Sequence, residues 1–332
     1  MGYRIGSFNV KNLSFGGKRD LDRIAHIILD NKLDIVAMQE VLSEGKILTG
    51  INGKSSVGAA KAYEYSLKRR LGENWGICWQ YPQTSAKNYP FLGGDSRGEG
   101  YAFLWNTDKF SLPKDENGND VYPRIWRNYK TNVEEGMIRL IRDPCVGRFI
   151  VKGRPSEIRL ITTHIVYGKP KDDKLSVDLD FGAVKMRQNE FKILAGQIYP
   201  RVSQYAKDVN CVAPYTIILG DYNMNLKESG IVTANVPSIA CFDDRGRMLD
   251  ENESGTFVIK TVQKDLSTLK RDSDALANNY DHFSYDISLE EKNIIGNATT
   301  INAIEQGDSS GSFDKYREDV SDHLPVVIDV NV

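Results

Sequence analysis

Hydrophobic residues near the start of the chain change from the spacing of a strand to that of a helix and back. Residues 3–9 form a short apolar run, and residues 35–38 read as a buried strand. Between them, Asp20 can cap a helix. Five residues of that helix fall on one face: Leu21, Ile24, Ala25, Ile28 and Leu29. The pattern therefore predicts a strand, a helix and a second strand.

Strand patterns outnumber helix patterns along the rest of the chain. Helical spacing recurs over residues 60–71 and 184–198, and Pro200 is expected to end the second of these helices. Short apolar runs predict strands at 101–105, 137–141, 149–151, 158–163, 216–219, 256–259, 281–285 and 325–330. Many of these runs have short connections, which favours mixed sheets covered by helices, an α/β (α+β) fold.

Polar segments rich in Gly, Asn, Asp, Lys or Ser interrupt this pattern near residues 43–56, 83–100, 113–132, 168–180 and 266–279. Strand patterns resume on both sides of each segment, so none of them has the character of a linker between domains. We predict a single domain over residues 1–332. The long segments are then surface insertions, which commonly carry substrate recognition.

Charge and composition exclude some functions. Lys and Arg total 43 against 45 Asp and Glu, a net charge of −2, so nucleic acid must bind through a local patch or a bound cation. Basic clusters occur at 68–70, 124–130 and 169–174, although each is equally compatible with a solvated face. No apolar run approaches the roughly 20 residues of a membrane helix. The four cysteines form no CxxC pair, and no signal peptide is evident, so we expect a cytoplasmic monomer.

Several apolar runs end abruptly in a polar side chain. Asn9, Glu40 and His164 each close such a run, and Asp221 and Asn223 follow another. The ends of strands are where α/β sheets gather their functional residues. If these strands are neighbours, their polar ends converge on one site.

The chemistry of this set is that of phosphoryl transfer. The oxygens of Glu40, Asp221 and Asp322, with the Asn9 and Asn223 amides, suit Mg²⁺ or Mn²⁺, with Ca²⁺ as an alternative. His164 and His323 are acid–base candidates near neutral pH. Each residue alone has an ordinary explanation as a turn, cap or buried side chain, which we retain for His26 and His282. Only their joint occurrence predicts an enzyme.

These residues stand in a familiar order. The motifs are SFNV at 7–10, DIVAMQE at 34–40, TH at 163–164, GDYN at 220–223 and SDHLPV at 321–326, with a weaker YDHF at 280–283. They resemble the endonuclease/exonuclease/phosphatase superfamily with the DNase I-like fold. That resemblance implies a four-layer sandwich of two mixed β-sheets flanked by helices, and it spans nearly the whole chain.

The resemblance also implies roles for individual residues. Asn9, Glu40 and Asp322 look like the metal site. Asp221 and Asn223 look like the pair that contacts the scissile phosphate and the attacking water. His323 looks like a catalytic histidine oriented by Asp281.

Two further segments resemble the two-histidine DNase I-type branch. The segment GEGYAFLW at 98–105 would make Glu99 the partner of His164. The segment IRDP at 141–144 would make Arg142 a phosphate-binding residue. Abasic-site enzymes and inositol polyphosphate 5-phosphatases match less well, because their characteristic segments near 164–168 and 280–283 are absent.

The sequence thus predicts a divalent-metal-dependent phosphodiesterase, an endonuclease that binds nucleic acid, with DNA preferred to RNA. The alternatives are a phosphatase or sphingomyelinase-type enzyme of the same fold acting on a small or lipid phosphoester, and a non-catalytic nucleic-acid-binding module. In the expected mechanism, His323 with Asp281 is the base and His164 with Glu99 is the acid. Asp221 is the alternative base.

Overall fold

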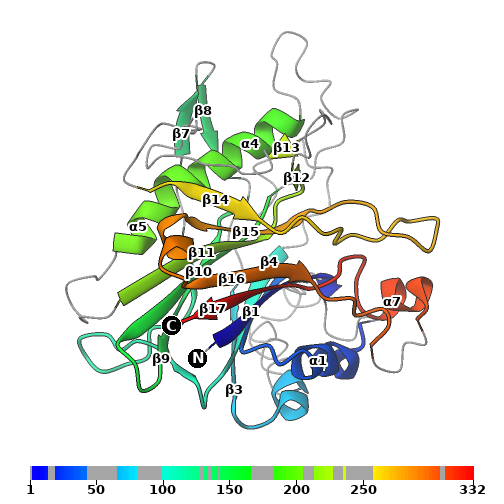
Figure 1. Ribbon diagram of the computed structural model, residues 1–332, viewed down its shortest axis with the longest axis horizontal. Coiled ribbons are helices and arrows are strands. Elements are labelled where there is room, and N and C mark those ends of the chain that lie inside the picture. The colour runs from blue at the N-terminus through cyan, green and yellow to red at the C-terminus, as the bar shows by residue number, and fades with distance from the viewer. Residues whose placement is uncertain are drawn as a thin grey trace, which may run out of the picture.

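Two β-sheets packed face to face form the centre of the protein (Figure 1). The computed structural model describes residues 2–13, 19–42, 66–80, 99–126, 130–133, 136–140, 142–165, 183–204, 213–226, 235–236, 257–306 and 311–332. The predicted insertions near 43–56 and 168–180 lie outside these ranges, as does all of 83–100 except its last two residues.

The first sheet, sheet A, joins both ends of the chain. Its strands, in spatial order, are β16 (Ile295–Thr300), β17 (Val326–Asn331), β1 (Gly2–Leu13), β2 (Ile35–Leu42), β4 (Glu99–Asn106) and β3 (Trp75–Gln80). The pair β1 and β2 is parallel, and the other pairs are antiparallel. Sheet A is therefore mixed, as expected.

The second sheet, sheet B, comes from the middle of the chain. Its strands, in order, are β14 (Ile259–Val262), β15 (Asp281–Asp286), β11 (Ala213–Asp221), β10 (Ser156–His164), β9 (Cys145–Val151) and β5 (Phe110–Ser111), and β6 (Arg124–Ile125) also pairs with β9. Only β10 and β11 are parallel along this path. Two small ribbons complete the strands: β7 (Lys130–Val133) with β8 (Gly136–Arg139), and β12 (Asn225–Leu226) with β13 (Asn235–Val236).

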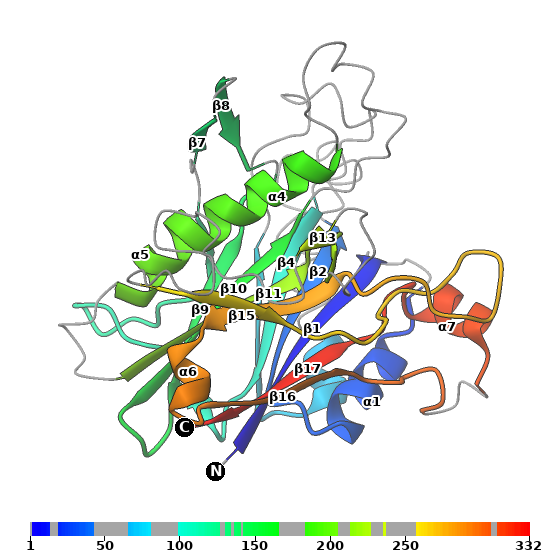
Figure 2. The same cartoon turned by 45° about the horizontal axis from the view of Figure 1, so that its top comes forward.

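Helices cover the outer face of each sheet. Helices α1 (Leu21–Asp30) and α7 (Phe313–Asp319) lie on the side of sheet A, and Asp20 caps α1 as predicted. Helix α4 (Ala183–Ile193), the π-helical turn η4 (Leu194–Ile198) and α5 (Tyr199–Gln204) run over sheet B (Figure 2). The short α6 (Ser288–Glu291) precedes β16. The architecture is the expected sandwich of two mixed sheets flanked by helices. Every helix in the described ranges is too short or too polar to span a bilayer.

The two sheets share one apolar layer, built by alternate residues of each strand. Phe103 and Trp105 of β4 lie against Phe149 of β9, with both ring-centroid distances 5.6 Å. Separate apolar layers hold α1 and α7 on sheet A and α4–α5 on sheet B. The layer between the sheets positions the candidate site. The same alternation of side chains along each strand continues beyond the apolar residues into polar residues at one edge of the layer.

Some details differ from the expectations. Leu29 is 38% exposed, although helical spacing placed it on the buried face of α1. Pro200 does not end its helix, because η4 interrupts the α-helix first and Pro200 becomes the second residue of α5, where a proline is tolerated. The strand expected at 256–259 begins only at Ile259.

Candidate active site

Strand alternation in sheet B brings three predicted residues side by side. His164 of β10 pairs in register with Asp221 of β11, and Asp221 pairs with Asp281 of β15. Residues in register on neighbouring strands face the same way, and here that face is the one packed on sheet A. The three side chains therefore extend the apolar layer as its polar edge.

Sheet A also contributes residues to this polar edge, some placed by strand alternation and one by a bulge. Asn9 and Glu99 follow the alternation that buries Ile5 and Phe103 between the sheets. Glu40 does not follow this alternation, because in β2 the side chain that points between the two sheets at this level is that of Gln39. A bulge at Glu40, with φ of +57°, turns its carboxylate toward Asn9.

His323 reaches the site from the loop between α7 and β17. The Ser321 hydroxyl donates to the Asn9 carbonyl at 2.6 Å and accepts from the His323 backbone N–H at 3.1 Å. The Tyr316 hydroxyl donates to the His323 carbonyl at 3.1 Å. This loop is thus fixed directly to the end of β1, which places His323 opposite sheet B.

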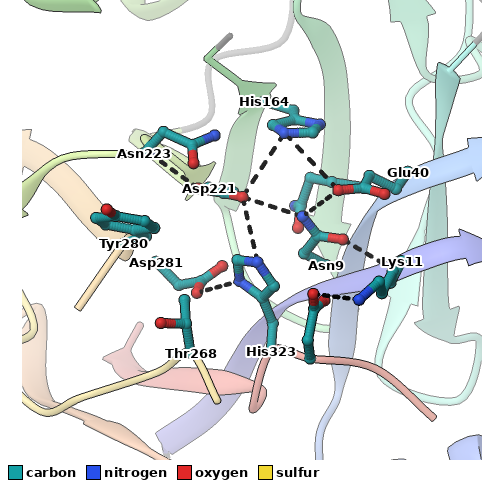
Figure 3. A network of polar contacts seen from close by, with 12 residues as sticks. Asn9, Lys11, Glu40, His164, Asp221, Asn223, Thr268, Tyr280, Asp281 and His323 are labelled. Atoms are coloured by element: carbon teal, nitrogen blue, oxygen red, sulfur yellow. Dashed lines mark hydrogen bonds and ion pairs between the residues drawn. The ribbon is translucent and has the colours of Figure 1, made fainter. Parts of the chain in front are cut away.

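Two imidazoles face one carboxylate oxygen at the centre of the site (Figure 3). The Nε2 atoms of His164 and His323 each lie 3.6 Å from Asp221 Oδ2. Each Nδ1 atom faces its own carboxylate: His323 Nδ1 is 2.8 Å from Asp281 Oδ2, and His164 Nδ1 is 3.1 Å from Glu99 Oε2. A carboxylate at Nδ1 fixes the orientation of the ring and stabilises its charged form.

Charge in this cluster opposes the effect of burial. Burial lowers the pKa of His323, but the carboxylates of Asp281 and Asp221 raise it to about 10. Burial and Arg142 lower the pKa of His164, but Glu99 and Asp221 raise it overall. Burial raises the pKa of Asp221 despite the two histidines. Both rings therefore tend toward the protonated form.

Arg142 shares the Glu99 carboxylate with His164. Its guanidinium lies 2.8 Å from Glu99 Oε2 and donates to the His164 carbonyl at 3.4 Å. Burial raises the pKa of Glu99, but His164 and Arg142 lower it to about 2. Arg142 therefore lies next to His164 and also forms an ion pair with Glu99.

Asn223 occupies a strained turn directly after β11. Its φ is +51°, its backbone N–H donates to Asp221 Oδ1 at 2.8 Å, and its side-chain amide donates to the Ile165 carbonyl at 2.8 Å. The buried Arg187 of α4 donates to the Asn223 carbonyl at 2.7 Å. The turn is held from both sides, which positions Asn223 against Asp221.

The expected metal ligands lie in one corner of the site. The Asn9 amide nitrogen donates to Glu40 Oε1 and to Asp221 Oδ2, both at 3.0 Å, and its oxygen accepts from the Lys11 backbone N–H at 3.0 Å. Asp322 forms an ion pair with the Lys11 ammonium. Glu40 and Asp322 offer carboxylate oxygens, and their side chains are 17% and 32% exposed, so their chemistry fits a hard divalent cation; Asn9 would add its amide oxygen, which now accepts from Lys11.

A second group could also hold a divalent ion. Asp221, Asp281 and His323 each offer one ligand atom, and these atoms lie within 4.8 Å of one another. In this group, His323 Nδ1 and Asp281 Oδ2 already form the carboxylate–histidine pair at 2.8 Å. The carboxyl oxygen Oδ1 of Asp281 is buried and has no hydrogen-bond partner.

Several supporting residues were missed in the sequence. Tyr101 is buried and accepts from the His164 backbone N–H at 3.3 Å, and the Ser267 hydroxyl donates to Asp281 Oδ2 at 2.7 Å. Gln39 bridges the two sheets by donating to Thr162 Oγ1 at 2.9 Å. Alternation from Glu99 could have identified Tyr101. No sequence pattern pointed to Ser267 or Arg187, because only tertiary packing brings these residues to the site.

Other predicted features lie elsewhere. His282 is buried, with its ring nitrogens 2.7 Å from the Met224 carbonyl and 3.2 Å from that of Gln263, in agreement with its ordinary explanation. In the basic cluster at 68–70, Arg70 pairs with Asp22, and the cluster at 169–174 lies outside the described residues. The insertion at 266–279 packs onto the His323 loop, where the Leu324 N–H donates to the Ser267 carbonyl at 2.7 Å.

Comparison with known proteins identifies the family. The family model "Endonuclease/Exonuclease/phosphatase family" matches residues 6–235, and the chain belongs to this family. Its members are phosphoric ester hydrolases that typically use divalent metals. The match does not distinguish the two-histidine branch from the others. No curated protein matches the chain.

Solved structures share the fold over the full length. A family protein from Bacteroides thetaiotaomicron is 14% identical, with 99% of this chain and 98% of that chain covered and a TM-score of 0.52. A mannosyl-6-phosphatase from the same species is 15% identical, with 99% and 100% covered and a TM-score of 0.51. A family protein from Leptotrichia buccalis is 17% identical, with 99% and 100% covered and a TM-score of 0.51.

Proposed function

We propose that this protein is a divalent-metal-dependent phosphodiesterase that hydrolyses nucleic-acid phosphodiester bonds, with DNA preferred to RNA. The observation that carries the proposal is the pair of imidazoles facing Asp221, each with its own carboxylate. Hydrolysis of a phosphodiester needs a proton acceptor for the attacking water and a proton donor for the leaving oxygen. Two oriented histidines and a carboxylate between them supply both.

In this mechanism, Glu40 and Asn9 would hold a Mg²⁺ or Mn²⁺ ion, and Asp322 is the third acidic or amide residue of this corner. When bound, the ion supplies positive charge against the phosphate oxygens. Arg142 and Asn223 bind further oxygens; the guanidinium fork suits phosphate, and the Asn223 amide has a second hydrogen besides the one donated to Ile165. His164, oriented by Glu99, donates the proton to the leaving oxygen.

The proton acceptor is either His323, oriented by Asp281, or Asp221. Because neighbouring carboxylates raise the pKa of His323 to about 10, this ring already carries its proton at neutral pH in the site as it stands. Asp221 Oδ2 lies 3.6 Å from the Nε2 atom of each ring, and burial raises its pKa. This position between the two rings supports Asp221 as acceptor.

A cleavage assay tests the function. Supercoiled plasmid, linear single-stranded DNA and RNA would be incubated with Mg²⁺, Mn²⁺ or EDTA, with His164→Ala and Asp221→Asn as controls checked for folding by circular dichroism. We expect metal-dependent cleavage that both variants lose. Equal cleavage in EDTA and Mg²⁺ would exclude the mechanism.

A small or lipid phosphoester is the alternative substrate. The fold is shared with a mannosyl-6-phosphatase, so the sandwich also accommodates a phosphomonoester in another protein. Faster turnover of a soluble phosphomonoester or of a phosphocholine lipid than of any polymer would replace the nuclease proposal. Tight nucleic-acid binding without cleavage under any divalent metal would indicate a binding module.

A further inference from the structure

Lys11 is held at three points beside the expected metal ligands. Its ammonium forms an ion pair with Asp322, its backbone N–H donates to Asn9 Oδ1 at 3.0 Å, and its carbonyl accepts from Arg19 Nε at 2.8 Å. Its φ of +38° belongs to the irregularity that interrupts the pairing of β1 with β2 between Asn9 and Leu13. Lys11 stands two residues after Asn9, so strand alternation already turns it toward the site. The contact with Asp322 is therefore built into the end of β1.

Asp322 already has a cationic partner. The Lys11 ammonium lies against its Oδ2 oxygen, and the two side chains are 34% and 32% exposed. An ammonium at this carboxylate offsets its negative charge and repels a second cation there, so Asp322 is a weaker ligand than an acid without such a partner.

Glu40 differs from Asp322 in this respect. Its oxygens accept from the neutral Asn9 amide at 3.0 Å and the Asn12 backbone N–H at 3.2 Å. Among the described residues, the ion pair of Glu40 is with His164 Nε2 at 3.9 Å, which is longer than the contact of Asp322 with the Lys11 ammonium. Of the two acids, Glu40 is the one available to a cation.

We propose that Lys11 keeps Asp322 out of the metal coordination shell, so that Glu40 and Asn9 are the protein ligands. This inference rests on the proposed function, because it concerns the cation of that site. Lys11 would then act as a fixed positive charge on Asp322. Its removal should release Asp322 for coordination.

Calorimetric titration of the metal-free full chain with MnCl₂ tests this directly, without any activity readout. Asp322→Asn should leave the Mn²⁺ affinity within about threefold, whereas Glu40→Gln should lower it at least tenfold. Lys11→Met should raise the affinity at least tenfold, or add a second ion, and Lys11→Arg, which keeps the charge, should not. The gain should vanish in Lys11→Met/Asp322→Asn, since the released carboxylate is then absent.

The outcomes separate the two proposals. A loss of affinity in Asp322→Asn as large as that in Glu40→Gln would make Asp322 a ligand and overturn the role of Lys11. A gain in Lys11→Met that persists without Asp322 would show a general charge effect and would also overturn it. Unchanged binding in Glu40→Gln would instead contradict the metal site of the proposed function. Circular dichroism of each variant would confirm folding.

Discussion

Glu40 shows how much of the site depends on single backbone conformations. Resemblance identified this residue, but strand alternation would have turned its side chain away from Asn9. The bulge and the φ of +57° correct the direction at a cost in stability. Periodicity alone cannot predict such a turn, because the conformation is imposed by the neighbouring strands β1 and β4.

A comparison of Glu40→Gly with Glu40→Ala should reveal this strain. Both variants lose the carboxylate, but only glycine adopts a positive φ without penalty, so Glu40→Gly should be more stable by about 1 kcal/mol. Urea unfolding without divalent ions measures the difference. Equal unfolding midpoints would mean that the bulge relaxes in the alanine variant and that little strain is stored there.

Glu99 should make stability depend on pH in the acid range. Its folded pKa of about 2 lies below the unfolded value of about 4.3, so its contribution is present above pH 4.3 and is lost as the pH falls toward 2. The difference in unfolding free energy between the wild type and Glu99→Gln should therefore shrink over this interval. Urea titrations at several pH values in metal-free buffer would measure it, and a difference independent of pH would contradict the ion-pair role.

Whole strands were predicted well where they are buried and poorly where they are exposed. The runs that became β10 and β11 carry buried apolar residues at their centres, at 160–161 and 217–219, and their polar ends became His164 and Asp221. Strand β16 was missed because it is an edge strand in which three of the six residues are exposed. Strand β3, also at an edge, was missed although Trp75, Ile77 and Trp79 alternate along one face. Hydrophobic pattern reports burial, so it locates the centre of a sheet better than its edges.

The pairing of β10 with β11 should not tolerate a side chain at Gly220. This residue has φ of +143° and faces Thr163, and an added Cβ would lie 1.9 Å from the Thr163 carbonyl oxygen. Gly220→Ala should therefore cost about 3 kcal/mol or more in unfolding free energy.

The matched control is Gly153→Ala. Gly153 has φ of +76° with no atom within 4 Å of an added Cβ, so its cost of about 1 kcal/mol reflects backbone conformation alone. Chemical denaturation of both variants would isolate the clash. Equal costs would show that β10 moves aside without difficulty.

At the scale of the molecule, each half of the site belongs to a different sheet. Asn9, Glu40 and Glu99 come from sheet A, whereas His164, Asp221 and Asp281 come from sheet B. The order of motifs allowed the family and its two-sheet fold to be predicted from the sequence. It could not give the contacts between the sheets, such as Gln39 with Thr162, because these depend on how two distant segments pack.

Packing between the sheets should therefore control activity. Phe149→Ala removes a ring that contacts Phe103 and Trp105 across the sheets, and it should cost about 3–5 kcal/mol and lower kcat at temperatures where the variant stays folded. Ile28→Ala, in the layer between α1 and sheet A, should cost about 2–5 kcal/mol with a smaller loss of kcat. Turnover of the substrate found in the cleavage assay and thermal unfolding would be measured together. Equal losses of kcat in the two variants would contradict the prediction that packing between the sheets controls activity.

The position of β17 between β16 and β1 also has a consequence for how the protein is made. Gly2 pairs with Asn331, so sheet A cannot close until β17 has left the ribosome. Contacts so distant in sequence form slowly, and meanwhile β1 presents an open edge on which another chain could pair. Asn9 and His323 meet only through the same closure, since Ser321 bonds to the Asn9 carbonyl. A nascent chain therefore has no complete site until β17 is in place, so the side chains of the site can act together only after β1 and β17 have paired.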